Sequence, residues 1–301
     1  MFNVILFIVL FAYKGEELLE LRIHSDYQFA NKNLLVMLSV PLGSEEITLY
    51  SYNTDKNSLD SAKIPIGRAP EEISFYGLNS IVCDENLVYI YDKHGRKINY
   101  YDLKGNYIGQ FLLTKSPYYM TGNSHNLILL GPRYIIHINT KSKQMQIREV
   151  NYKDFSPVDI WIGTAYEDTA VFIEATKMVL LKFSLKGGEF IGAYSVKGKN
   201  EWCAKTVEKK YESGAIGIAV VSSFANIIKY KNYYVLQRRD LEEDEKSVLL
   251  FVDDKTFTIK RVVKFPRTAI LISYCPLKDE FLIINENGRL AKLTPTKLGI
   301  R

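Results

Sequence analysis

Cysteine is scarce in this 301-residue chain, and its spacing excludes the usual cysteine chemistry. The three cysteines, Cys83, Cys203 and Cys275, are odd in number and far apart, so they provide neither a CxxC pair nor a disulfide framework. Cysteine use therefore does not decide the redox compartment. Cys83 and Cys275 lie in apolar, strand-like runs, where we expect buried free thiols that behave as small hydrophobic groups.

Histidine is also rare, and its distribution argues against a metal site. The chain has four histidines, and none has a second His or Cys at a ligand spacing. His94 lies in the tight turn Asp92-Lys93-His94-Gly95, where solvent exposure is expected. His137 lies in the alternating run YIIHIN, which predicts a strand-face residue with a hydrogen-bonded ring. We therefore expect no metal and no cofactor.

Signatures of common enzymes are missing as well. The chain contains no Gly-rich phosphate loop, GxSxG, HExxH, EF-hand loop or dinucleotide fingerprint. Neighbouring carboxylates occur at Glu71–Glu72, Asp84–Glu85 and Asp253–Asp254, but adjacency in sequence does not place two carboxyls across a cleft. The last two pairs are typical of turn formers whose side chains accept hydrogen bonds from local backbone.

Charge is mild and dispersed. The net charge is +5 with a pI near 8.8, and the longest basic clusters are Lys209–Lys210 and Arg238–Arg239. A nucleic-acid binder usually concentrates its basic residues on one face or in one run. The pattern argues against a nucleic-acid partner, and RNA binding through a basic face is kept only as a third hypothesis.

Long hydrophobic runs are absent too, because the longest, Val4–Tyr13, is too short to span a membrane as a helix. It has the length of a signal-peptide core, but no Lys or Arg precedes it and no clear cleavage site follows. Residues 1–15 therefore fit either an export signal or a strand that closes the fold. We expect no transmembrane span, and we favour an exported protein, periplasmic or at the cell surface, over a cytoplasmic one.

What the chain has in quantity is tyrosine and phenylalanine, 21 and 15 residues, against only nine prolines. Tyr and Phe suit half-buried sheet surfaces. The clearest segment, Gly67–Phe111, contains four strand-like runs: LNSIVCDE, NLVYIYD, RKINYYDL and NYIGQFLL. Turn signals follow at 84–86, 93–95 and 104–106, where Gly95 and Gly105 are predicted to take positive φ.

Looser copies of this unit recur along the chain. First strands are predicted near residues 78, 118, 159, 223 and 271, so most steps are about forty residues, the period of a four-stranded propeller blade. Three further strands are predicted at 34–40, 47–53 and 61–66. The last unit lacks a fourth strand, which an N-terminal strand would supply. The sequence therefore predicts an all-β, six-bladed β-propeller of four-stranded antiparallel blades, with a two-sheet sandwich as the rival.

Two segments interrupt the pattern. Residues 199–214, KNEWCAKTVEKKYESG, lack alternation and are rich in Ala, Lys and Glu, which predicts a short helical insertion between blades. Asp240–Lys246, DLEEDEK, is expected to be a solvated hairpin loop rather than a metal site. Because no linker-like stretch occurs, residues 1–301 are expected to form one domain.

Blade two carries a family likeness. The order VYIYD, GRKINYYDLKG and NYIGQF resembles an NHL-type repeat. GRAPEE at Gly67–Glu72, after ITLYSYNTDKN, is similar to the Gly-Arg-Gly-Pro-Glu-Glu-like turn of TolB-like six-bladed propellers common in Bacteroidetes, with Ala69 in place of the family's Gly. The resemblance spans residues 30–295, with motifs only in blades one and two. It implies the fold and, for many relatives, export or lipid anchoring, but no activity.

Four residues are the predicted ligand contacts: Arg68, Glu72, Arg133 and Trp202. Gly67–Glu72 connects two blades on the face where propellers usually bind ligands, and Arg133 lies in a tight turn of blade three. Trp202 is a candidate exposed anchor in the insertion, whereas Trp161 is expected in the core. The structural alternative is that Arg68 pairs with a neighbouring blade and Pro70 rigidifies the crossover.

These features predict a non-enzymatic binding or scaffold propeller that recognises a protein or carbohydrate on one rim of the channel. The chain is expected to be monomeric. The alternative is a hydrolase or lyase with dispersed polar residues at the central channel.

Overall fold

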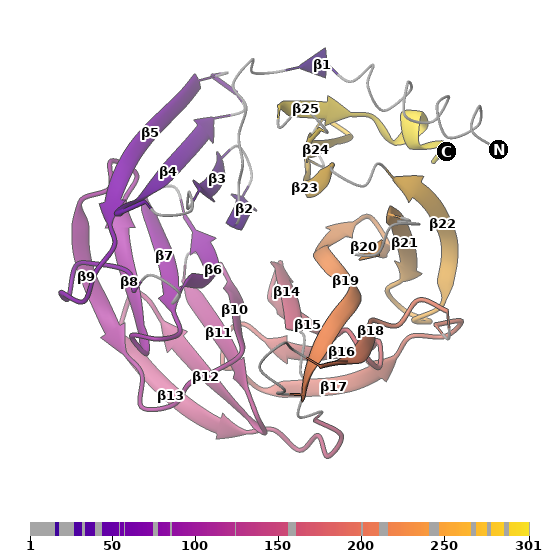
Figure 1. The fold of residues 1–301 in the computed structure, drawn as a ribbon, viewed down its shortest axis with the longest axis horizontal. Coiled ribbons are helices and arrows are strands. Elements are labelled where there is room, and N and C mark those ends of the chain that lie inside the picture. Colours follow the sequence, from indigo (N-terminus) through magenta and orange to yellow (C-terminus); the bar gives the residue numbers. More distant parts are fainter. Residues whose placement is uncertain are drawn as a thin grey trace.

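The computed structural model describes residues 16–17, 27–31, 34–39, 44–53, 55–56, 58–74, 78–84, 86–123, 125–155, 161–199, 201–210, 216–240, 247–265, 269–275, 278–285 and 289–300. Their strands form six antiparallel sheets arranged as blades around a central axis (Figure 1). The predicted six-bladed β-propeller is therefore confirmed, and the sandwich alternative is wrong.

The blades follow the chain in order. Blade one contains β2 (Tyr27–Asn31), β3 (Leu34–Ser39), β4 (Glu46–Asn53) and β5 (Ser58–Pro65); blade two β6 (Leu78–Cys83), β7 (Leu87–Asp92), β8 (Lys97–Asp102) and β9 (Tyr107–Leu112); blade three β10 (Tyr119–Gly122), β11 (Asn126–Gly131), β12 (Tyr134–Asn139) and β13 (Gln144–Glu149). Blade four contains β14 (Trp161–Tyr166), β15 (Thr169–Glu174), β16 (Val179–Ser184) and β17 (Phe190–Ser195); blade five β18 (Lys205–Lys210), β19 (Ile216–Tyr230), β20 (Tyr233–Asp240), β21 (Ser247–Asp253) and β22 (Ile259–Phe265); blade six β23 (Ile270–Cys275), β24 (Glu280–Ile284) and β25 (Leu290–Leu293).

The N-terminal part of the chain completes blade six. Strand β1 (Glu16–Glu17) pairs antiparallel with β25, with Glu16 opposite Lys292. This pairing gives the last blade its fourth strand and confirms closure of the ring by an N-terminal strand. Residues 1–15 lie outside the described residues.

The hydrophobic core is divided among the junctions between blades. Six clusters of buried side chains each join two successive blades, and the sixth joins blade six to blade one. Strand β3 shows how this works, because its successive side chains point to opposite faces. Val36 and Leu38 pack toward blade two, while Leu35 and Met37 pack toward blade six. Central strands are therefore apolar on both faces.

One backbone hydrogen bond recurs in the first four blades. The aliphatic residue just after the outer strand donates its N–H to the turn before the third strand: Ile66 to Glu45 (2.8 Å), Leu113 to Arg96 (2.8 Å), Val150 to Arg133 (2.9 Å) and Val196 to Met178 (3.0 Å). These turns and the crossovers to the next blade therefore share one face of the ring, here called the crossover face. The other turns lie on the opposite, hairpin face.

Glycine positions in blade two agree with the predictions only in part. Gly105 has φ of 82°, as expected, but Gly95 is not left-handed; Arg96 takes that conformation, with φ of 48°. Gly95 is required by space instead, because a Cβ there would lie 2.5 Å from Asp92 Oδ2.

The predicted helical insertion at 199–214 is wrong for its central part. Residues 205–210 form β18, which pairs antiparallel with the first half of β19 and extends blade five. Helix propensity in so short a segment is weak, and pairing with the β-branched run IGIAVV outweighs it. Residues 241–246 of the predicted hairpin loop lie outside the described residues.

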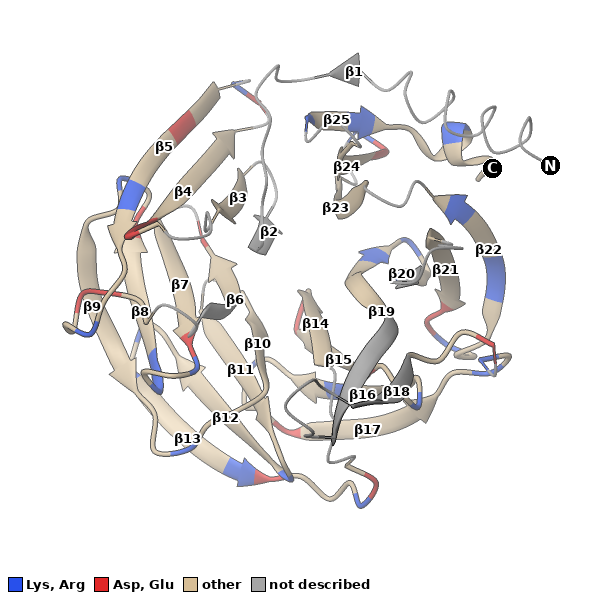
Figure 2. Cartoon of the chain, viewed as in Figure 1, with Lys and Arg blue, Asp and Glu red and all other residues tan. Residues whose placement is uncertain are grey.

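Further sequence predictions concern the cysteines, the charged residues and membrane-spanning segments. Cys83 and Cys275 are buried free thiols, as expected. Charged residues of both signs are distributed over the blades, whereas those of the outer strand β22 are all Lys or Arg (Figure 2). No helix in the described part of the chain has the length and apolar character needed to cross a membrane; the only helical element there is the short 3-10 turn η1 (Pro295–Leu298).

Candidate functional site

An open pocket of about 660 Å³ lies on the crossover face of blade two. Its walls come from the crossover after β5, from the turn between β7 and β8, and from outer strand β9. Arg68, Ser74 and His94 provide polar groups, and Pro70 and Leu112 provide apolar ones. A cavity of this size is within the range of small-ligand sites.

Side chains of β8 hold the crossover in place through hydrogen bonds to its backbone carbonyls. The Lys97 ammonium donates to the carbonyls of Ala69 (3.0 Å), Pro70 (3.0 Å) and Glu72 (2.7 Å). Because Lys97 is buried, desolvation lowers its pKa, and the carboxylates of Asp92 and Glu72 oppose that shift. Each ammonium donor thus has a carbonyl acceptor.

Two further residues of β8 also hold the crossover by hydrogen bonds. The Asn99 amide donates to the carbonyls of Pro70 (3.1 Å) and Glu72 (3.0 Å), and the Tyr101 hydroxyl donates to the carbonyl of Glu71 (2.8 Å). The loop carbonyls therefore point into the protein and are satisfied there. The pocket is consequently formed before any ligand arrives.

Asp92, the last residue of β7, joins the two polar walls. Its Oδ2 accepts hydrogen bonds from the Ser74 N–H (2.9 Å) and hydroxyl (2.8 Å), while Oδ1 accepts from the Gly95 N–H (2.8 Å). The crossover and the β7–β8 turn are therefore held in register by one carboxylate.

Of the predicted ligand contacts, Arg68 alone lines this pocket. Its side chain is exposed and has no ion-pair partner among the described residues, so the alternative in which Arg68 pairs with a neighbouring blade finds no support there. His94 is exposed, as predicted, and lines the same pocket. The pocket thus presents the Arg68 guanidinium and the His94 imidazole to solvent.

The other three candidates lie elsewhere. The Glu72 carboxylate turns back to accept from the Ala69 N–H (2.7 Å), which closes its own loop. Arg133 is exposed in the β11–β12 turn of the next blade. Trp202 is half-buried against the core between blades four and five, and the Arg238 guanidinium lies 5.9 Å from its ring centroid. Their ligand roles remain predictions. Trp161 is buried in the core, as expected.

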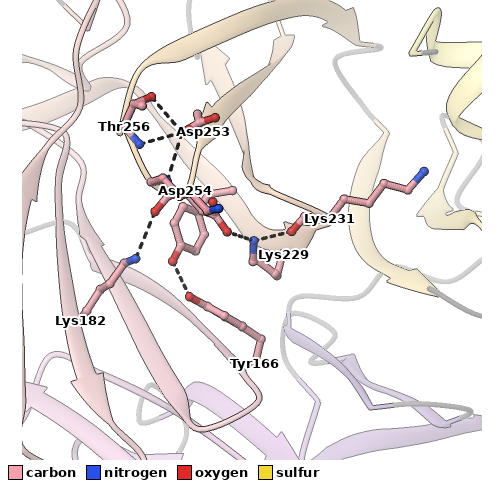
Figure 3. A network of polar contacts seen from close by, with 9 residues as sticks. Tyr166, Lys182, Lys229, Lys231, Asp253, Asp254 and Thr256 are labelled. Carbon is pink, nitrogen blue, oxygen red and sulfur yellow. Dashed lines mark hydrogen bonds and ion pairs between the residues drawn. The ribbon is translucent and has the colours of Figure 1, made fainter.

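Sequence reasoning missed a second polar cluster, on the hairpin face between blades four and five (Figure 3). The Lys229 ammonium lies 2.5 Å from Asp254 Oδ2, and the two side chains are 18% and 20% exposed. The Tyr166 and Tyr234 hydroxyls form a hydrogen bond of 2.6 Å. Among the described residues, the Lys182 ammonium forms a hydrogen bond only with the Asp254 carbonyl, at 3.4 Å.

Aromatic rings surround both lysines. The Lys182 nitrogen lies 4.7 Å from the ring centroid of Phe257, 5.1 Å from that of Tyr234 and 5.3 Å from that of Tyr194. The Lys229 nitrogen lies 5.3 Å from the Tyr234 centroid. Burial lowers the pKa of Lys182; the Asp254 carboxylate opposes this shift, and the Lys229 charge adds to it.

The neighbouring aspartates explain why the cluster was missed. Asp253 is a turn former, as predicted, because its Oδ1 accepts from the N–H groups of Lys255 (3.1 Å) and Thr256 (2.7 Å). Asp84 does the same for Asn86 and Leu87. Asp254 departs from the prediction, since its carboxylate pairs with Lys229. Only the fold brings β16, β19 and this turn together, so no local motif marked them.

In the described ranges, no three or more His, Cys, Asp and Glu side chains lie close enough together to hold a metal ion. His137 lies on β12 with its Nε2 2.9 Å from Asn126 Oδ1, so its ring is hydrogen-bonded, as predicted; it is also buried, and burial lowers its pKa.

Comparison with known proteins gives a likeness in fold. No protein-family model and no curated protein matches the chain. Among solved structures, a member of the DUF4221 family from Bacteroides vulgatus has a TM-score of 0.54 at 10% identity, with 90% of this chain and 93% of that chain covered. The β-propeller domain of Cps50 (Swd1) from Myceliophteria thermophila has a TM-score of 0.51 at 11% identity, with 90% and 97% covered.

These identities are too low to carry an activity from one protein to another. Both likenesses extend over nearly the whole of each chain, and one of them is to a Bacteroides propeller. The chain is a six-bladed β-propeller, similar in fold to these proteins.

Proposed function

We propose that this protein is a binding module that recognises a protein or glycan through the pocket on the crossover face of blade two. The observation that carries this proposal is a fixed pocket whose rim presents polar groups that have no partner among the described residues. Lys97 and Asp92 hold the walls in place, while Arg68 and His94 face the opening.

The chemistry of the rim favours a ligand that carries a carboxylate. A guanidinium forms two parallel hydrogen bonds with a carboxylate, and Arg68 has no such partner among the described residues. Pro70 and Leu112 offer apolar surface beside it, and Leu112 is 66% exposed. An acidic peptide segment or an acidic sugar residue would satisfy both parts of this surface.

Rigidity of the pocket adds to the proposal. Ordering a loop on binding opposes affinity, and here the crossover is already ordered by hydrogen bonds to four of its carbonyls. As to family, we propose a divergent relative of the TolB-like or NHL-type propellers, supported by the GRAPEE turn and by the likeness to a Bacteroides propeller.

Binding to a panel of acidic and neutral oligosaccharides and acidic peptides, measured by fluorescence or calorimetry, tests the proposal. We expect an acidic member to bind and Arg68→Ala to weaken it by about tenfold or more, because a charge-assisted hydrogen bond is lost. Arg133→Ala is the matched control, since Arg133 is also exposed on this face but lies outside the pocket.

Two outcomes would count against the pocket: no binding by any member of the panel, or binding that Arg68→Ala leaves unchanged. The alternative hydrolase or lyase at the central channel predicts instead that panel members are converted to products, at a rate that Arg68→Ala does not alter. Chromatography of the same mixtures distinguishes that result from simple binding.

A further inference from the structure

The cluster on the hairpin face is separate from the proposed pocket, which lies on the opposite face of the ring. We propose that Lys182 forms a Schiff base with a small anionic carbonyl compound of the 2-oxo acid class, and that Asp254 carries the proton in this step. The inference rests on the contacts of Lys182, Lys229 and Asp254 and goes beyond the proposed binding function.

Lys182 has the geometry of an available amine. Its side chain is half-buried, and its ammonium makes one long hydrogen bond within the described part of the chain, 3.4 Å to the Asp254 carbonyl. No carboxylate in the described part of the chain pairs with it. The rings of Phe257, Tyr234 and Tyr194 surround the nitrogen and restrict its position without occupying its hydrogen-bond donors.

Lys229 makes the amine more reactive. A lysine becomes nucleophilic when burial or a second cation favours its neutral form. Both conditions hold here: burial lowers the pKa of Lys182, Asp254 opposes the shift, and Lys229 lowers it further. Asp254 Oδ2 is already paired with Lys229 at 2.5 Å, so much of its charge is balanced there rather than at Lys182.

Asp254 has one oxygen left for proton transfer. Its Oδ1 is buried and has no hydrogen-bond partner among the described residues. An unsatisfied buried acceptor is costly, so this oxygen favours any donor placed beside it. The Lys182 ammonium, which contacts the backbone carbonyl of the same residue, and the hydroxyl of a carbinolamine would both be such donors once a small rotation brings them within reach.

The reaction balances without a co-reactant. Lys182 gives one ammonium proton to Asp254, and the neutral amine nitrogen attacks the carbonyl carbon to form a carbinolamine. Asp254 returns the proton to the carbinolamine oxygen, which leaves as water while the C=N bond forms. The sum is a carbonyl compound plus an ammonium giving a protonated Schiff base plus water.

The charge of the cluster selects the class of carbonyl compound. Two ammonium groups and one carboxylate leave a net charge of +1, which favours an anionic ligand. Tyr166 and Tyr234 do not compete, because burial raises the pKa of both hydroxyls and keeps them neutral. The stacked rings of Tyr194 and Phe257, with centroids 4.3 Å apart, offer a flat surface beside Lys182.

Reductive trapping tests the proposal with the full-length protein. The protein is incubated at neutral pH with glyoxylate and cyanoborohydride, and the modified lysines are identified by peptide mass spectrometry over time. We expect Lys182 to be labelled about tenfold faster than exposed Lys186, although it is less accessible. Lys182→Arg keeps the charge among the rings and should remove this label from a folded protein, as checked by circular dichroism.

Two variants separate proton transfer from simple electrostatics. If Asp254 acts only through its charge, Asp254→Asn should speed labelling of Lys182, because the carboxylate opposes the lowered pKa. If Asp254 carries the proton, labelling should slow by about tenfold or more. Acetaldehyde, which is neutral, should label Lys182 more slowly than glyoxylate does. Labelling that simply follows exposure, or that Asp254→Asn accelerates, would overturn the proposal.

Discussion

Two lysines of this propeller share the property of a pKa lowered by burial, yet their surroundings differ. Lys97, under the pocket on the crossover face, donates to three backbone carbonyls at 2.7–3.0 Å. Lys182, on the hairpin face, has one contact at 3.4 Å and three aromatic rings. The first ammonium has all of its donors satisfied by the protein, whereas the second retains donors for another partner.

The difference shows that burial alone does not distinguish a structural lysine from a reactive one. Both side chains lose solvation, and in both cases the nearest carboxylates oppose the lowered pKa. What separates them is the set of acceptors. Satisfied donors fix Lys97 as part of the pocket's frame, and unsatisfied donors leave Lys182 free to react.

The largest expected effect is on stability. Lys97→Met should remove three hydrogen bonds from an ammonium to loop carbonyls, each of which keeps one other donor, the Glu72 N–H or the Asn99 amide. We expect the free energy of unfolding to fall by about 3 kcal/mol, since a hydrogen bond to a charged group contributes about 1.5–3 kcal/mol and the remaining donors and re-entering water compensate in part. Lys182→Met should cost about 1 kcal/mol or less, the size of the lost cation–π contacts. Denaturant unfolding of both variants measures the contrast.

The same comparison extends to binding. If Lys97 holds the pocket in shape, Lys97→Met should also lower the affinity for the ligand that Arg68 binds, while Lys182→Met should leave that affinity unchanged. Equal destabilisation by the two substitutions would remove the distinction between a satisfied and an unsatisfied ammonium.

A smaller effect is expected from the ion pair beside Lys182. Asp254→Ala should lower the free energy of unfolding by about 2 kcal/mol, because it leaves the Lys229 charge without its carboxylate. The loss should be smaller than for a fully buried pair, because both side chains are partly exposed. Adding Lys229→Met should recover part of that loss. The exposed pair Lys186–Asp168, with side chains 75% and 63% exposed, is the control, and Asp168→Ala should cost about 0.5 kcal/mol or less.

A double-mutant cycle on Lys229 and Asp254 measures this coupling directly. An interaction energy near that of the exposed control pair would mean that Asp254 is not committed to Lys229. Its carboxylate would then be available as an acceptor for Lys182. The two lysines, Lys97 and Lys182, would differ less in how far their ammonium donors are satisfied.

The sequence was sufficient for the fold because each blade repeats a local signal. Alternating apolar runs, a spacing of about forty residues and short polar turns predict a propeller without any contact information. Closure was predictable as well, because blade six lacked a strand that β1 supplies. The segment 199–214 failed, since pairing of β18 with β19 depends on a partner strand rather than on local propensity.

The candidate sites divide in the same way. The crossover 67–72 was identified because a turn motif marks it; Arg68 lines the pocket there, and its role in binding stays a prediction. Gly95 was predicted for its φ but serves by lacking a Cβ beside Asp92, which only coordinates reveal. Lys182 and Lys229 look like any other lysine in sequence, so their shared surroundings were beyond local reasoning.

The smallest expected effect, and the most direct measure of the contrast, is the titration of individual lysines. Lys182 should titrate below the ordinary lysine value, because burial outweighs the Asp254 charge and Lys229 adds to the shift. Lys231 should titrate above it, because Asp279 holds its ammonium at 3.1 Å. Carbon-13 NMR of dimethylated lysines reads both midpoints in one sample, with Lys182→Arg assigning its signal.

The two shifts act on stability with opposite sign. The native state binds fewer protons at Lys182 than the unfolded chain does, so over the pH range just below the ordinary lysine value this residue makes stability rise with pH. At Lys231 the native state binds more protons, and its contribution is lost as pH rises through the raised pKa. If Lys182 titrated together with the exposed lysines, its amine would be no more available than theirs at neutral pH, and acceptor satisfaction would not separate it from Lys97.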